Sequence, residues 1–160
     1  MRNPRRSRRG ARGNRFLPSV VTLFYANISS LTLEAQEFLL QQEKAQVVMA
    51  AEVHRLSASA RSLAQVAKLK GREVHFAPST PSDTSPLGSY SGCAQWVQRH
   101  LHRAPHDDAS WEKGVWMQEG ANFCCLTLAV SKMPLVVAVG YCKDGLDESV
   151  LQVDLMLSEA

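Results

Sequence analysis

Short apolar runs of strand length alternate with helical patterns through the first half of the chain, and this alternation constrains the fold most. Three runs have the length and the β-forming side chains of buried strands: Val20–Ala26, Gln46–Ala51 and Val74–Ala77. Between them, Thr32 and Ser57 are each placed to cap a helix, and Gly71 is placed to close the second helix. The order strand, helix, strand, helix, strand predicts an α/β fold in which helices cover a sheet.

The second half of the chain adds strands with no helical pattern between them. A loop rich in Pro and hydroxyl residues is predicted at Pro78–Tyr90. Four strands and a final helix are predicted after it: Cys93–Val97, Val115–Gln118, Phe123–Val130, Leu135–Cys142 and the helix Asp147–Ser158. The two middle strands predict a hairpin that turns at Glu119–Gly120. We therefore expect a layered α/β sandwich with a mixed sheet.

Nearly all of these predicted strands are apolar on both faces, although only two or three helices are available to cover them. A sheet that is buried on both faces needs a second covering layer. We expect that layer to come from a missing half of the protein or from a partner. A sheet face left uncovered would favour self-association.

The positive charge is concentrated at the start of the chain. The segment Met1–Arg15 contains seven Arg and no acid, whereas the remainder contains 11 basic and 15 acidic side chains. We expect residues 1–18 to form a basic disordered tail and residues 19–160 to form the folded domain. The tail could bind phosphates, act as a nuclear signal, belong to an organelle transit peptide, or be a solvated terminus.

Composition excludes several classes of protein. With 45% hydrophobic and 21% charged residues the chain is not predicted to be disordered, and no apolar run approaches the roughly 20 residues of a membrane span. The four cysteines form no CxxC pair and follow no signal peptide. We therefore expect buried thiols and an intracellular location, with nucleus or organelle open. Cys124 and Cys125 would point to opposite faces of one strand, so they cannot chelate a metal side by side.

Two polar residues follow the first two predicted strands directly. Asn27 ends the first strand and Glu52 ends the second. If the strands are adjacent and parallel, the two side chains meet at one edge of the sheet, where α/β folds place their sites. A carboxylate and an amide there could hold Mg²⁺ through oxygen ligands and water. Alternatively, Asn27 forms a turn and Glu52 caps the helix that follows.

Four segments carry motifs in a characteristic order: Tyr25–Leu31, Val48–Leu56, Ser89–Ala94 and Val136–Tyr141. They resemble motifs of the endonuclease/exonuclease/phosphatase superfamily, which has the DNase I-like fold. The first two are similar to the family's apolar strand with Asn-x-(Asn/Asp)-Gly-Leu and to its strand with Gln-Glu-Thr. The other two are similar to a Tyr-Ser-Gly turn and to a strand ending in Tyr. The resemblance implies that the chain is the N-terminal half of a four-layer sandwich.

The resemblance also implies residue roles and a cofactor. Glu52 would be the carboxylate ligand of a catalytic Mg²⁺, and Asn27 would lie beside it, orienting the phosphate or a metal-bound water. Tyr141 would donate a hydrogen bond to the phosphate, and His54 would occupy a position where the family often has a basic or polar side chain. The substrate would be a nucleic acid or another phosphoester.

This sequence departs from the family pattern at several positions. Ala51 replaces the Gln before the Glu, Ser29–Ser30 stands in place of Asn/Asp-Gly, and Cys142–Lys143 follows the Tyr where Pro is usual. The later Gly-Asp-x-Asn and Ser-Asp-His motifs do not occur. We therefore expect a partial phosphodiesterase that does not turn over alone, with a mobile-element endonuclease as one origin. The rival interpretation is a non-catalytic module that binds nucleic acid or another partner through its Arg-rich tail.

Two further clusters have both a functional and a structural interpretation. His100, His102 and His106 could bind zinc, or could belong to a polar surface loop. Three tryptophans interleave with basic residues, and they could stack on nucleic-acid bases or pack within a sheet: Trp96, Trp111 and Trp116.

Overall fold

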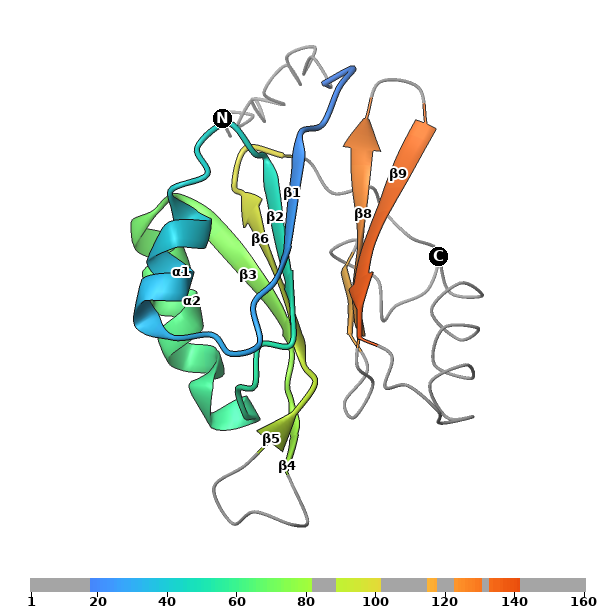
Figure 1. Ribbon diagram of the computed structural model, residues 1–160. Helices are drawn as coiled ribbons and strands as arrows, with labels where there is room; N and C mark the ends of the chain where they lie inside the picture. Colours follow the sequence, from blue (N-terminus) through green and yellow to red (C-terminus); the bar gives the residue numbers. More distant parts are fainter. Residues whose placement is uncertain (1–17, 82–88, 102–114, 118–122, 131–132, 142–160) are drawn as a thin grey trace, which may run out of the picture.

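The computed structural model describes residues 18–81, 89–101, 115–117, 123–130 and 133–141 (Figure 1). The predicted basic tail, the predicted helix at Asp147–Ser158 and the hairpin turn at Glu119–Gly120 lie outside these residues. Within the described part of the chain, no helix is long and apolar enough to cross a membrane.

A four-stranded mixed sheet forms the centre of the molecule, with strand order β1-β2-β6-β3. Its strands are β1 (Leu23–Asn27), β2 (Val47–Ala51), β3 (Arg72–Ala77) and β6 (Cys93–Gln98). β1 runs parallel to β2, and β6 runs antiparallel to both β2 and β3. The predicted strand-helix alternation and the mixed sheet are both confirmed.

Two helices cover one face of this sheet (Figure 1). Helix α1 (Leu33–Leu40) begins where the sequence predicts, because the Thr32 hydroxyl accepts a 3.1 Å hydrogen bond from the Ala35 N–H. The predicted cap of the second helix is wrong. Ser57–Ser59 form a 3₁₀ turn, and α2 (Ala60–Leu69) follows it without a side-chain cap. The predicted end is confirmed, since Gly71 has the left-handed φ of 69°.

The core between helices and sheet is built from one face of each strand. On β2, Val48 and Ala50 point toward the helices, and both are fully buried. Their neighbours in this core include Leu39 of α1, Leu63 of α2 and Trp96 of β6. Leu39 and Leu63, one from each helix, thus help to cover this face of the sheet.

A second sheet covers the other face of the first, with strand order β7-β8-β9. Its strands are β7 (Val115–Met117), β8 (Phe123–Val130) and β9 (Met133–Gly140), all antiparallel. The alternate residues of β2, Val47, Met49 and Ala51, pack against this sheet and are at most 7% exposed. The chain itself therefore supplies the second layer for β2, where we had expected a partner or a missing half.

Cysteines and one glutamine lie in the core between the two sheets. Cys93 and Cys124 are both fully buried there, and burial raises the pKa of the Cys124 thiol well above its usual range. Cys125, on the opposite face of β8, is buried as well, which confirms that the two neighbours face apart. Gln95 is also fully buried, and its Nε2 donates to the carbonyls of Cys124 and Val137 at 3.1 and 3.0 Å.

The region predicted as a loop at Pro78–Tyr90 contains one short strand pair. β4 (Thr80–Pro81) pairs antiparallel with β5 (Ser89–Tyr90). The loop prediction is therefore wrong at its two ends, where the chain continues the β3 and β6 directions as a narrow ribbon (Figure 1).

Candidate functional site

The first two strands bring their terminal polar residues into contact. Asn27 pairs with Ala51 across the parallel strands, which places it beside the next residue, Glu52. The Asn27 Nδ2 donates a 3.0 Å hydrogen bond to Glu52 Oε1, and the Asn27 Oδ1 accepts from the Ser29 N–H at 3.4 Å. The structure confirms the prediction that these two residues lie together at one edge of the sheet.

The loop that carries Glu52 is held on both sides by backbone hydrogen bonds. The bonds are Ile28 N–H to Ala51 O (3.3 Å), Leu31 N–H to Val53 O (2.9 Å), Val53 N–H to Gly92 O (3.2 Å) and His54 N–H to Ser91 O (3.1 Å). The loop after β2 thus continues the pairing of the sheet beyond the strand ends. Glu52 is therefore carried by a fixed backbone, as a ligand-binding carboxylate requires.

Left-handed backbone conformations gather in the same loops. Outside glycine, the described residues with positive φ are Ser29 (53°), Glu52 (57°), His54 (48°) and Ser91 (62°). Each such residue costs about 1–3 kcal/mol, and conformations of this kind cluster at functional sites. All four follow β1 or β2 or precede β6, so the strain is confined to the edge of the sheet that carries Asn27 and Glu52.

His54 has its ring fixed by one contact. Its Nδ1 lies 2.6 Å from the carbonyl oxygen of Ser89, so in the neutral ring Nδ1 carries the proton and donates to that oxygen. The Nε2 atom is then the acceptor. The family resemblance predicted His54 near the site. The tautomer of its ring, however, depends on a contact with a residue 35 positions away in the chain.

Tyr141 lies directly after β9, half-buried against the core between the sheets. β9 ends toward the same side of the molecule as β1, the lower side in Figure 1. Among the described residues, no hydrogen bond links Tyr141 to Asn27 or Glu52. The structure thus joins two of the three predicted site residues directly and places the third at the end of a strand in the second sheet.

The oxygen atoms at this edge fit Mg²⁺ better than a softer metal. The described residues contain no group of three His, Cys, Asp or Glu side chains that could hold a metal ion. Glu52 is half-buried, and one of its two oxygens already accepts from Asn27. One carboxylate with an amide oxygen nearby suits Mg²⁺, which retains several waters, whereas zinc requires a fuller set of protein ligands.

Sequence reasoning did not find Ser79, and it included Gly92 only as part of the Tyr-Ser-Gly turn; both residues shape the same edge. The Ser79 hydroxyl donates to Ser91 O at 2.9 Å, and the Ser79 N–H donates to Arg55 O at 2.8 Å. Gly92 has φ 86°, and a Cβ there would lie 2.4 Å from Ser79 Oγ. The dipeptide Ser91–Gly92 indicates a turn in the sequence. The close approach of Gly92 to Ser79 is a contact between distant residues, so the turn signal alone could not predict it.

The other predicted clusters are only partly described. Trp96 is fully buried in the core against the helices, so it packs within the sheet and does not stack on bases. The side chains of Trp111 and Trp116 lie outside the described residues, as do His102 and His106. His100 is exposed at the end of β6. The zinc interpretation therefore stays untested.

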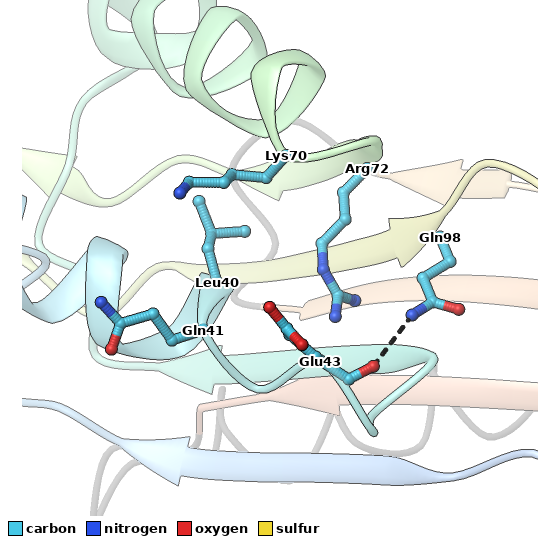
Figure 2. Close-up of a pocket in the computed structure, with 6 residues that line it drawn as sticks. All are labelled: Leu40, Gln41, Glu43, Lys70, Arg72 and Gln98. Carbon is cyan, nitrogen blue, oxygen red and sulfur yellow. Dashed lines mark hydrogen bonds between the residues drawn. The ribbon is translucent and has the colours of Figure 1, made fainter.

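A cationic hollow at the opposite end of α1 is structural. It is lined by Lys70, Arg72, Glu43 and their neighbours (Figure 2). Arg72 is 3% exposed, and its two terminal nitrogens donate to four backbone carbonyls, those of Gln42, Ala45, Gln46 and Trp96. Because the terminal nitrogens of the Arg72 guanidinium are engaged by backbone carbonyls, Arg72 is not free to bind an anionic ligand in this hollow.

The helices and the two sheets form an α/β sandwich with a DNase I-like fold. A solved structure of this kind, the human Nocturnin catalytic domain with bound sulfate anion, is similar to the chain. The TM-score is 0.50 at 14% identity, and the match covers 89% of this chain and 61% of that one. The chain thus spans about three fifths of the Nocturnin catalytic domain. No protein-family model and no curated protein match the sequence.

Proposed function

We propose that the chain carries the magnesium and phosphate site of a phosphodiesterase or endonuclease of the DNase I-like kind. Glu52 is the metal ligand in this proposal, and Asn27 orients its carboxylate through the 3.0 Å hydrogen bond. That hydrogen bond is the observation that carries the proposal. Mg²⁺, when bound, would neutralise the charge of a phosphate group brought to the same edge.

Two further residues are assigned supporting roles. Tyr141 would donate its hydroxyl to a phosphate oxygen, where a fixed donor is most effective. His54 would present Nε2 at the site, since its Nδ1 is engaged by Ser89 O. Tyr141 follows a strand that ends toward the same side of the molecule as β1, and His54 lies two residues after Glu52, which supports the assignment.

We further propose that the chain binds phosphoesters without turning them over. Among the described residues, Glu52 belongs to no group of three His, Cys, Asp or Glu side chains, whereas the reaction needs a base and further charge stabilisation. In this proposal, turnover would require residues from a complementary half of the domain. The proposal also includes an origin in a mobile-element endonuclease.

The first experiment measures Mg²⁺-dependent binding of a short phosphorothioate DNA duplex by fluorescence anisotropy. We expect Mg²⁺ to tighten binding, and Glu52→Gln to abolish most of that effect, since the amide cannot replace a charged ligand. Glu43→Gln is the matched control, because Glu43 is exposed and lines the hollow at the other end of α1. Equal Mg²⁺ responses of wild type, Glu52→Gln and Glu43→Gln would refute the metal assignment.

The second experiment tests turnover on supercoiled plasmid and on an abasic-site duplex with Mg²⁺. We expect no cleavage above a protein-free control. Cleavage that Glu52→Gln removes would show that the chain is active alone.

The basic tail supports a second candidate function, binding of nucleic acid without a metal. Met1–Arg15 holds seven of the 18 basic residues, so counterion release would make such binding strongly dependent on salt. A salt titration with and without this segment separates the two candidates. If the tail accounts for all binding and Glu52→Gln has no effect, the second candidate is correct.

A further inference from the structure

A small hollow between the beginnings of α1 and α2 has an unusual lining. Its volume is about 160 Å³. Leu33 of α1 and Leu63 and Val66 of α2 form apolar walls, and Leu31 lies at its base. The polar groups that line it come from one amide, one guanidinium and two hydroxyls, and no acidic side chain lines it.

Gln36 provides a buried donor without a partner. The side chain is 5% exposed and lines the hollow, and its Nε2 has no hydrogen-bond partner in the part of the chain that the structure describes. Buried polar groups are almost always hydrogen-bonded in folded proteins, so a lone amide at a cavity wall indicates a missing acceptor.

Arg55 provides a fixed cation at the rim of the same hollow. Its Nε donates a 2.8 Å hydrogen bond to Leu31 O, which sets the plane of the guanidinium. Its two terminal nitrogens have no hydrogen-bond partner among the described residues. A guanidinium presented in this way matches the two oxygens of a carboxylate.

The apolar walls decide between classes of anion. A free phosphate dianion is strongly hydrated, and burying it against leucine and valine side chains would be costly. A carboxylate attached to an apolar body satisfies both halves of the lining. The volume also suits such a ligand, since an apolar cavity of about 150 Å³ accepts benzene.

We propose that this hollow binds a small carboxylate with an apolar body. The carboxylate accepts from Gln36 and Arg55, and the apolar body lies against Leu33, Leu63 and Val66. Ser59 and Ser62 complete the polar side, where the Ser62 hydroxyl donates to Ser59 O at 2.8 Å. The inference does not depend on the role of Glu52.

The test is a titration of the full chain, labelled with ¹⁵N, with three probes followed by NMR. Benzoate has the charge and the apolar ring, benzamide has the ring without the charge, and inorganic phosphate has charge without the ring. We expect saturable shifts with benzoate at amides around residues 31–36 and 55–66, and at least tenfold weaker effects with the other two probes. Equal responses to benzoate and benzamide, a stronger response to phosphate, or no response would each overturn the proposal.

Two variants localise the binding. Gln36→Leu should weaken benzoate binding at least tenfold and raise the thermal midpoint, since it removes an unsatisfied buried amide. Gln41→Leu, an exposed glutamine at the other end of the helix, is the matched control and should bind as the wild type. Arg55→Lys keeps the charge without the planar fork and should weaken binding by a smaller factor. Wild-type benzoate affinity in Gln36→Leu would show that benzoate does not bind through Gln36 in this hollow, and would overturn the proposal.

Discussion

At the scale of single residues, the candidate site depends on backbone conformations that most side chains avoid. Glu52 and His54 both have positive φ. Val53, which lies between them, bonds to Leu31 and Gly92 through its backbone, and the His54 N–H donates to Ser91 O. Such strain persists only where the surroundings over-determine it. The loop is therefore expected to tolerate substitution poorly at the positions that lock it.

Gly92→Ala should lower the free energy of unfolding by about 3 kcal/mol. The new Cβ would meet Ser79 Oγ at 2.4 Å and Val53 Cγ2 at 2.9 Å, in addition to the cost of a φ of 86°. Chemical denaturation measures the change.

Gly71→Ala is the matched control for this prediction. Gly71 also has a left-handed φ, 69°, but nothing lies within 4 Å of its would-be Cβ. Only the backbone cost remains, about 1 kcal/mol. Equal losses in both variants would mean that the contact with Ser79 is unimportant.

At the scale of elements, Arg72 fastens the connection between α1 and β2. This residue is the first of β3, yet its guanidinium donates to Ala45 O at 2.8 Å and Gln42 O at 3.0 Å, both in that connection (Figure 2 shows the side chain). Burial lowers its pKa, but an arginine stays charged at neutral pH. Together with the bonds that Gln42 Nε2 donates to Phe38 O and Gln98 Nε2 donates to Glu43 O, these bonds explain how the connection keeps one conformation.

Arg72→Met should lower the free energy of unfolding by about 2–4 kcal/mol, because buried carbonyls lose their donors while the apolar stem is kept. Arg99→Met, at an exposed arginine just after β6, should change it by no more than about 0.5 kcal/mol. Urea denaturation of both variants gives the comparison. A loss in Arg72→Met as small as in Arg99→Met would contradict the structural role.

At the scale of the whole molecule, Gln95 joins the two sheets. It is fully buried on β6, and its Nε2 donates to carbonyls of both β8 and β9, while its Oε1 has no partner among the residues that the structure describes. Apolar contacts between the sheets, such as those of Leu126 and Val137, are not directional. The amide therefore sets the register of the sandwich.

Gln95→Glu should destabilise the fold by about 3 kcal/mol at pH 7, because a carboxylate has no proton to donate and is buried opposite two carbonyls. Burial would raise the pKa of this new carboxyl in the folded state. The loss of stability should therefore grow as the pH rises above about 4.3, the pKa of a glutamate in the unfolded chain. It should be smaller at pH 4.5 than at pH 7.

Unfolding free energies of wild type and variant at pH 4.5 and pH 7 measure this dependence. Gln41→Glu, at an exposed position, is the control and should show little difference between the two pH values. A pH-independent loss in Gln95→Glu would mean that shape, and not charge, causes it.

The sequence by itself determined the elements and the meeting of Asn27 with Glu52. Strand and helix signals are local, since they come from side-chain periodicity and caps such as Thr32. Two adjacent parallel strands joined by one helix place their terminal residues at the same edge, so the contact of Asn27 with Glu52 followed from that condition, whereas the roles of the site residues came from the family resemblance. The failures were also local in origin: Ser57 had the chemistry of a cap, but the chain enters α2 through a 3₁₀ turn.

Only the tertiary structure decided what covers the central sheet and how the site loop is held. Apolar residues on both faces of β2 predict burial but not its source, and the second sheet that buries Val47 and Met49 comes from residues far along the chain. Three other features also depend on contacts between distant segments. They are the ring orientation of His54, the close approach of Gly92 to Ser79, and the backbone carbonyls that accept from Arg72. Periodicity records which face of an element is buried, whereas the identity of the covering atoms depends on how the elements pack together.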